Sequence, residues 1–413
     1  MPMPSNAVLR AHAGLAAGAL LLSVSACAEA GDAAADITPT EFTPVVTQIA
    51  EGLEWPWGIA ALPNGDMLVT EREGRVRLIR DGTLVETPVS GAPTDAYIDR
   101  QGGYLDLELH PGFAENRLVY MSYSQGDSDS NRTAVLRATL SDDGMALERA
   151  EVIFTSDVPE KRGGAHFGSR IGFLSDGSML VTLGDGYGWM DEAQNTANHY
   201  GKVVRLTEDG APAAGNPFAG DGAGEEAGAG DGDPAVFTYG HRNVQGLAYD
   251  ADRDIIYAHE HGPKGGDELN LLTAGTNYGW PEISYGVDYD GTIITPDTAK
   301  PGMAQPAIKW VPSIAPSGMA LYTGEIYPGW QGDLFIGAMN GPDGQKLVRV
   351  DLDGAGQPVG TEDIVLGETL GFRDVVQGVD GHLYLASNDL EGGIYRLDIA
   401  DATDTASAGE ATQ

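Results

Sequence analysis

The sequence predicts an all-β protein: a six-bladed β-propeller with four-stranded antiparallel blades. Three observations lead to this prediction. A turn-and-strand phrase occurs six times, no stretch has the apolar spacing of a long amphipathic helix, and turn residues are abundant. The 58 glycines and 23 prolines among 413 residues allow many tight turns without reaching a low-complexity composition.

The repeated phrase is a turn rich in Asp, Asn and Gly, followed by a short strand of aliphatic or aromatic residues. Clear copies lie at 62–69, 174–181 and 379–385, and looser copies end at residues 119, 256 and 335. The positions that mark the six copies are Leu68, Leu118, Leu180, Ile255, Leu334 and Leu383. A repeat of about 50 residues is typical of propeller blades, and longer gaps indicate inserted loops.

Further strands are expected where the phrase continues across a glycine turn, as at 74–79 and 393–397. Such pairs are what antiparallel blades require, and closing the ring removes the exposed edges of many short strands. Residues 42–49 are expected to supply the strand that closes the ring with the last blade. Two β-sandwiches are the alternative, which explains the strands but not the sixfold phrase.

The N-terminus has the features of an export signal. Arg10 precedes an apolar run from Ala13 to Ala26, which is shorter than the roughly 20 residues of a membrane span. The run ends at Val24-Ser25-Ala26-Cys27, which resembles the lipobox of bacterial lipoproteins, with Cys27 as the acylated residue. Ordinary signal-peptidase cleavage, leaving a free thiol, is the alternative. The prediction is a periplasmic lipoprotein of a Gram-negative bacterium.

The expected organisation is a signal peptide at 1–26, a tether at 27–41, the propeller at 42–399 and a disordered tail at 400–413. Residues 215–234 are acidic and of low complexity, so we expect a flexible surface loop there. Weak calcium binding by its carboxylates is the alternative, although no spacing in it matches a calcium loop.

Charge and cysteine content exclude several classes of function. With 61 acidic and 24 basic residues, the formal charge of -37 argues against nucleic-acid binding and adsorption to anionic lipids. The single cysteine excludes an internal disulfide and a cysteine-based zinc site.

Four segments carry polar residues that a propeller core does not need: 101–106, 163–170, 239–246 and 259–268, the last followed by 277–281. Glycines beside His166 and around Gly262 suggest that a ligand approaches the backbone closely. Arg242 beside Asn243 suits an anionic ligand with carbonyl groups. Carbonyls exposed at the turn of Gly262 and Pro263, with carboxylates nearby, suit calcium.

Each of these features also has a structural interpretation. His166 is equally suited to capping a carbonyl in a propeller turn. His259 and His261 have a zinc-like spacing, but no third ligand is evident.

Taken together, the segments resemble the soluble quinoprotein aldose sugar dehydrogenases of the glucose/sorbosone dehydrogenase family, which are six-bladed propellers. The matching runs lie at 55–58, 101–103, 166–170, 239–243, 260–268, 277–281 and 372–375. They keep the family's order, and the resemblance covers residues from about 42 to 398. It implies pyrroloquinoline quinone (PQQ) and calcium as cofactors, an aldose oxidised to its lactone, and an external electron acceptor, a quinone or a cytochrome.

The resemblance also implies roles for individual residues. His166 would be the general base, and Arg242 would stabilise charge on the quinone oxygen. The remaining implied cofactor contacts are Gln101, Asn243, Tyr289, Asn340 and Arg373. Backbone oxygens of Gly262 and Pro263 would hold one calcium, and Glu268 with the Tyr278 carbonyl would hold a second, structural one.

The chain departs from the family pattern at two cationic positions. Asn340 stands where a lysine is usual, and Gly371 replaces the first arginine of an Arg-x-Arg pair, so that only Arg373 remains. Each lost charged hydrogen bond would weaken cofactor binding by about 1.5–3 kcal/mol if nothing compensates. Lys346 is a candidate substitute, and Arg242, Arg373 and Lys264 are the cations expected to oppose the acidic surface.

Two other functions stay open on the sequence. A calcium-dependent six-bladed lactonase would use side-chain carboxylates and Asn around a central metal. A propeller without cofactor that binds glycans or proteins would explain Asn340 and Gly371.

Overall fold

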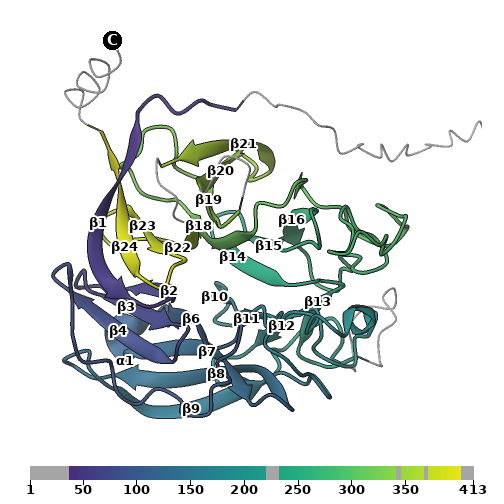
Figure 1. The fold of residues 1–413 in the computed structure, drawn as a ribbon, viewed down its shortest axis with the longest axis horizontal. Coiled ribbons are helices and arrows are strands. Elements are labelled where there is room, and N and C mark those ends of the chain that lie inside the picture. The colour runs from purple at the N-terminus through teal and green to yellow at the C-terminus, as the bar shows by residue number, and fades with distance from the viewer. Residues whose placement is uncertain (1–36, 220–231, 341–345, 367–370, 401–413) are drawn as a thin grey trace, which may run out of the picture. The chain divides into compact units, whose positions relative to one another are not determined.

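The computed structural model describes residues 37–219, 232–340, 346–366 and 371–400. The predicted signal peptide, residues 27–36 of the predicted tether, most of the acidic loop and all but the first residue of the predicted tail lie outside these residues. The described chain forms six four-stranded antiparallel sheets arranged around a common centre, which confirms the six-bladed propeller (Figure 1).

The sheets follow one another along the chain, and each begins with its innermost strand. The first sheet consists of β2 (Pro56–Ala61), β3 (Met67–Glu71), β4 (Arg75–Arg80) and β5 (Thr83–Leu84). The second consists of β6 (Tyr104–Leu109), β7 (Leu118–Gly126), β8 (Asn131–Leu140) and β9 (Leu147–Thr155). The third consists of β10 (Ile171–Phe173), β11 (Met179–Thr182), β12 (Lys202–Leu206) and β13 (Val236–Tyr239). The fourth consists of β14 (Val244–Asp250), β15 (Ile255–Glu260), β16 (Asp267–Leu272) and β17 (Ile308–Trp310). The fifth consists of β18 (Pro316–Leu321), β19 (Leu334–Ala338), β20 (Lys346–Leu352) and β21 (Pro358–Val365). The sixth consists of β22 (Phe372–Gln377), β23 (Leu383–Ser387), β24 (Gly392–Ile399) and β1 (Pro44–Leu53).

Helix is scarce in the described chain. It has one turn of α-helix, α1 (Phe113–Asn116), and a 3₁₀ turn, η1 (Met190–Gln194). None of its helices is long and apolar enough to cross a membrane.

The six marker positions of the repeated phrase all fall in the second strand of a blade: β3, β7, β11, β15, β19 and β23. The turn of the phrase is therefore the hairpin that returns the chain from the innermost strand. The innermost strands β2, β6, β10, β14, β18 and β22 contact one another in sequence, and β22 returns to β2, so they form a closed ring.

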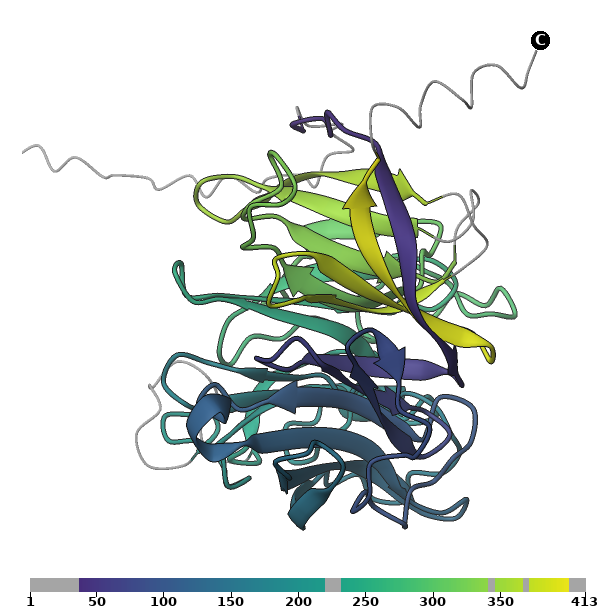
Figure 2. The same cartoon turned by 90° about the vertical axis from the view of Figure 1, so that its left-hand side faces the viewer.

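The ring is closed by the first strand of the described chain. β1 pairs antiparallel with β24, from Pro44 opposite Ile399 to Leu53 opposite Gly392. Figures 1 and 2 both show purple β1 alongside yellow β24. The closing strand expected at 42–49 is thus present, and it extends four residues further than expected.

The end of the predicted tether contacts the fifth blade. Thr38 N–H donates to Asp351 at 2.7 Å, and Thr40 Oγ1 donates to Glu362 at 2.7 Å. Trp330, which is fully buried, donates its indole N–H to Thr40 at 2.9 Å. Contact with the propeller therefore begins before residue 42.

The core lies between blades. Each of six clusters of buried apolar side chains draws its members from two adjacent blades. Alternate residues of one strand serve the two interfaces: in β3, Leu68 packs toward the second blade, whereas Met67 and Val69 pack toward the sixth. This two-sided burial explains why the strands are almost continuously apolar.

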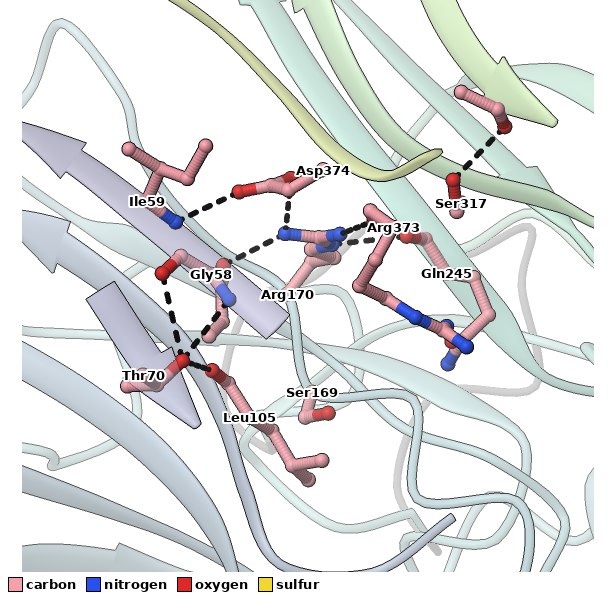
Figure 3. A network of polar contacts seen from close by, with 12 residues as sticks. Gly58, Ile59, Thr70, Leu105, Ser169, Arg170, Gln245, Ser317, Arg373 and Asp374 are labelled. Atoms are coloured by element: carbon pink, nitrogen blue, oxygen red, sulfur yellow. Dashed lines mark hydrogen bonds and ion pairs between the residues drawn. The ribbon is translucent and has the colours of Figure 1, made fainter. Parts of the chain in front are cut away.

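A charged network ties the innermost strands together (Figure 3). Arg170, just before β10, contacts Asp106 of β6 and Asp374 of β22 at 2.8 Å each, and its guanidinium lies 4.2 Å from the Trp57 ring centre. Asp374 also accepts the Ile59 N–H at 2.9 Å. Because Arg170 and the residues it connects come from four different blades, the network holds the ring together at its centre.

Candidate active site

One end of the propeller collects nearly all the polar segments singled out in the sequence. It is the end where the innermost strands begin and the second strands stop. Gln101, His166 and Arg242 precede β6, β10 and β14, while Gly262 and Asn340 follow β15 and β19. The blade topology therefore brings segments far apart in the sequence onto one face.

Four cavities on this face share walls. The first, near the axis, is lined by Trp57, Arg72, Gln101, Leu105, Phe167, Gly168, Ser169, Gln245, His261, Met339 and Arg373. The second, of about 590 Å³, shares His261 with it and is lined by Gly262, Pro263, Lys264, Tyr289, Val311 and Asn340, among others. The third, of about 170 Å³, shares Pro263 and Tyr289 with the second and adds His166, Asp185, Tyr187, Arg242 and Trp280. The fourth, smaller cavity shares Arg242, Pro263 and Trp280 with the third and adds Glu260, Glu268 and Tyr278.

His166 is held in one orientation by two contacts. Its Nδ1 lies 2.6 Å from Asp185 Oδ1, and its backbone N–H donates to Gln101 Oε1 at 2.8 Å. An ionised carboxylate accepts only, so Nδ1 carries the proton and Nε2 is the ring nitrogen left for the cavity. His166 also has a positive φ of 52°, which is uncommon outside glycine and is found at functional sites.

Asp185 is itself fixed by three donors. Besides His166, its Oδ1 accepts the Tyr187 N–H at 2.8 Å, and its Oδ2 accepts the indole N–H of Trp280 at 2.8 Å. Asp185 is 1% exposed. Burial raises the pKa of the Asp185 carboxyl, but its interactions with His166 and the charge of Arg242 outweigh burial and hold that pKa below its ordinary value.

The environment of His166 favours the neutral imidazole. Burial lowers the pKa of His166, and the charges of Arg242 and Lys161 lower it further, although Asp185 opposes them. A neutral imidazole with an accessible Nε2 is a proton acceptor, as a general base requires.

Arg242 lies between the third and fourth cavities. Its Nη1 donates to the carbonyls of His261 and Gly262 at 3.1 and 2.6 Å, and its backbone N–H donates to Glu260 at 2.5 Å. Its guanidinium lies 5.4 Å from the Trp280 ring centre and 5.9 Å from that of Tyr289. The two rings leave the cation on the cavity wall beside His166.

Asn243 has a different position from Arg242. It is 1% exposed, and its Oδ1 accepts the Gly168 N–H at 3.1 Å behind the cavity wall. Gly168 has a positive φ of 64°, and a Cβ there would lie 2.6 Å from the Leu183 Cα, so glycine is required at this point of the loop. Asn243 therefore supports the loop that carries His166.

Tyr289, Lys264 and Asn340 lie on the rim of the second cavity. Tyr289 is 57% exposed and also borders the third cavity, so it stands between the two. Lys346, the expected substitute for a missing cation, is instead buried in β20 and pairs with Asp363 of the same blade. That expectation is wrong because the strand register directs Lys346 at β21.

The fourth cavity contains two carboxylates on adjacent strands. Glu260 of β15 is paired in register with Glu268 of β16. Glu260 accepts from His241 at 2.8 Å, whereas burial and the charge of Glu260 raise the pKa of Glu268 well above its ordinary value. A buried carboxylate beside a half-buried one is a site that a cation would stabilise. Tyr278, the other predicted ligand, lines the same cavity.

His259 and His261 do not form a metal site together. His259 is fully buried within blade four, while the His261 Nε2 lies 2.6 Å from the Pro316 carbonyl oxygen at the first cavity. Within the described residues, no three His, Cys, Asp or Glu side chains gather as a metal site would require. Any metal here would depend on backbone carbonyls, as predicted for Gly262 and Pro263.

Sequence reasoning missed three residues at this face: Asp185, Trp280 as the indole donor to Asp185, and Arg72. Asp185 lies in one of many Asp-Gly pairs, so nothing local distinguishes it. Trp280 was part of a matching run, but its contact with Asp185 spans 95 residues. Arg72 directly follows β3, a position that faces the axis only once the blades are assembled.

Comparison with known proteins covers most of the described chain. Residues 53–396 match the family model described as Glucose / Sorbosone dehydrogenase. The aldose sugar dehydrogenase YliI of Escherichia coli is 36% identical over 358 residues, covering 85% of this chain and 92% of that protein.

Solved structures of related proteins have the same fold. The apo form of the soluble aldose sugar dehydrogenase of Escherichia coli is 33% identical, with a TM-score of 0.78, over 87% of this chain and 100% of that one. The PQQ-bound form of the aldose sugar dehydrogenase of Streptomyces coelicolor is 28% identical, with a TM-score of 0.69, over 88% of this chain and 100% of that one.

Proposed function

Because the chain belongs to the glucose/sorbosone dehydrogenase family, we propose that it oxidises the anomeric hydroxyl of an aldose to a lactone, with PQQ and calcium as cofactors. The observation that carries the proposal is the buried pair of His166 and Asp185 on the wall of a cavity it shares with Arg242. When bound, the quinone supplies the hydride acceptor and calcium supplies a Lewis acid.

The residues of the chain supply the proton chemistry. Nε2 of His166 accepts the proton of the anomeric hydroxyl, and Asp185 stabilises the imidazolium that forms. Arg242 presents a positive charge to a negatively charged oxygen in the same cavity. Trp280 is buried beside His166 and restricts water there, whereas Tyr187 packs edge-on against the His166 ring and is 50% exposed.

The first cavity fits an anionic cofactor such as PQQ. Arg373 and Arg72 face it together with the amides of Gln101 and Gln245. Arg373 hydrogen-bonds only neutral acceptors, Asn388 at 3.2 Å and Gln245 at 3.4 Å, among the described residues. Burial and the charges of Arg170 and Arg72 lower the pKa of Arg373 to about 9, and an anion would relieve this strain.

The donor sets also fit calcium, with one constraint. Glu260 and Glu268 offer carboxylate oxygens beside Tyr278. At the other predicted site the Gly262 carbonyl already accepts from Arg242, so a metal there must share that oxygen or displace the guanidinium.

The charged network at the centre of the propeller argues against a calcium-dependent lactonase. A lactonase calcium would lie among axial carboxylates, but Asp106 and Asp374 both contact Arg170 at 2.8 Å, so a metal there would compete with the guanidinium. The cofactor-free alternative predicts no quinone binding, so the same experiment tests it.

The experiment is reconstitution with PQQ and calcium, followed by dye reduction with a panel of aldoses. We expect sugar-dependent reduction, and His166→Ala should lower kcat by about 10²–10⁴-fold. His382→Ala is the matched control, since His382 lies in the turn after β22, at the opposite end of the blade. No reduction with any aldose, or equal rates in His166→Ala and the unsubstituted protein, would refute the proposal.

The proposal includes export as a lipoprotein, for which the sequence of Val24 to Cys27 is the support. Labelled palmitate should be incorporated into the protein in cells and lost in Cys27→Ser. Incorporation that is unchanged in Cys27→Ser, or undetectable in both, would contradict the lipid anchor. The physiological acceptor of the electrons is proposed to be a quinone or a cytochrome.

A further inference from the structure

Arg373 is a cation without a carboxylate partner in the described chain. The carboxylate of Asp374, its neighbour in sequence, turns away to Arg170 and the Ile59 N–H (Figure 3). The guanidinium of Arg373 instead contacts the Asn388 and Gln245 amide oxygens at 3.2–3.4 Å. In a protein with 61 acidic residues, this arrangement is unusual enough to require a cause.

Arg72 brings a second guanidinium to the same cavity. It directly follows β3, and its guanidinium lies 4.6 Å from the Trp55 ring centre. Its side chain is 21% exposed, and its carboxylate contact is Glu73, a partly exposed neighbour at 3.6 Å. Stacking on the indole fixes the plane of the guanidinium while leaving N–H groups for a ligand.

The two arginines are close enough to affect each other. The charge of Arg72 is one of the causes that lower the pKa of Arg373, after burial and the charge of Arg170. Two like charges facing one cavity oppose folding unless an anion lies between them. The amide groups of Gln101 and Gln245 complete a wall that suits a carboxylate.

We propose that Arg72 and Arg373 together form a clamp for a carboxylate of the quinone cofactor, in which Arg72 supplies the cation missing at Asn340 and Gly371. The clamp rests on the proposed function, because the cofactor is the anion assigned to it. Asn340 borders the second cavity without a charge, and Gly371 has no side chain. Arg72 therefore reaches the ligand from blade one, whereas the two departures lie in blades five and six.

The test is titration of quinone-free protein with PQQ in calcium buffer. Quenching of tryptophan fluorescence reports binding, because Trp57 and Trp280 line the cavities. Arg72→Gln should raise Kd at least about tenfold, the size of one charged hydrogen bond, and should reduce the dependence of Kd on salt. Arg72→Lys, which keeps the charge without the planar fork, should give an intermediate Kd.

Arg132→Gln is the control, since Arg132 is exposed on β8 and its loss changes net charge equally. Thermal unfolding checks that each variant is folded, and Arg72→Lys replaces Arg72→Gln if the latter is not. Tight quinone binding that is unchanged by substitution of Arg72 would overturn the clamp and leave the proposed function intact. Absence of quinone binding in the unsubstituted protein would overturn both.

Discussion

Nδ1 of His166 lies 2.6 Å from Oδ1 of Asp185, and the other oxygen of that carboxylate accepts the indole N–H of Trp280. The carboxylate thus fixes the imidazole from one side while a tryptophan fixes the carboxylate. The two residues are 19 positions apart and come from the loop before β10 and the loop after β11 in one blade. The arrangement leaves one ring nitrogen, Nε2, facing the cavity.

Asp185→Asn should therefore lower kcat by about 10²-fold or more, because the amide no longer stabilises the imidazolium and permits the wrong tautomer. Quinone affinity should change less than kcat, since Asp185 does not line the first cavity, which holds Arg72 and Arg373. Steady-state kinetics and the quinone titration measure the two effects. Asp290→Asn, an exposed carboxylate near the rim, is the control. A variant with normal kcat would show that the pair is only structural.

The acidic limb of the pH profile should lie below the ordinary histidine pKa of about 6.5. Burial lowers the pKa of His166, so the imidazole stays unprotonated, and competent as a base, at lower pH. Lys161→Met should move the limb to higher pH, because a positive charge that opposes protonation is removed. The profile of kcat/KM in the free enzyme reports this pKa.

Lys300→Met, at a half-exposed lysine paired with Glu282, should leave the limb in place. The lowered pKa of His166 also makes the stability of the fold depend on pH. The unfolded chain takes up a proton near pH 6.5 that folded His166 takes up only at lower pH, so His166 destabilises the fold as pH falls below that value. An acidic limb at or above pH 6.5 would contradict the burial argument.

Arg170→Met should destabilise the fold by about 3–5 kcal/mol, because it leaves the buried carboxylates of Asp106 and Asp374 without a cation. Denaturant unfolding measures this difference. Arg132→Met, at an exposed position on β8, should change stability by less than about 0.5 kcal/mol. If the two variants are equally stable, the network in Figure 3 does not hold the ring.

The fold was predictable because its signal is repeated and local. Leu68, Leu180 and Leu383 follow the same turn, and each lies in the second strand of its blade. The pairing of β1 with β24 was also predictable, since a ring needs a closing strand and residues near 42–49 were left for it. The extension of β1 to Leu53 was not, because it follows from bulges in the pairing rather than from the phrase.

The site was predictable only where chemistry shows in short motifs. His166, Arg242 and Gly262 lie in such motifs and line adjoining cavities. Asp185 and Arg72 act through contacts between distant segments, and their local sequence resembles many other turns. The wrong expectation for Lys346 has the same cause. Its pairing with Asp363 depends on the register of β20 with β21, which the local sequence does not show.

Glu268→Gln should abolish stabilisation by calcium in the absence of quinone. In the metal-free protein the pKa of Glu268, adjacent to Glu260, is raised well above its ordinary value, so a neutral isostere should not lower the melting temperature. The unsubstituted protein should gain about 2.7 kcal/mol when free calcium is 100 times its Kd, and should lose this gain in excess EDTA. Thermal unfolding with calcium and with EDTA measures both proteins. Glu148→Gln, at an exposed position on β9, should keep the full calcium response. If calcium stabilises the Glu268→Gln variant as strongly as the unsubstituted protein, the metal binds elsewhere. A neutral amide at this position cannot replace the carboxylate charge that attracts calcium.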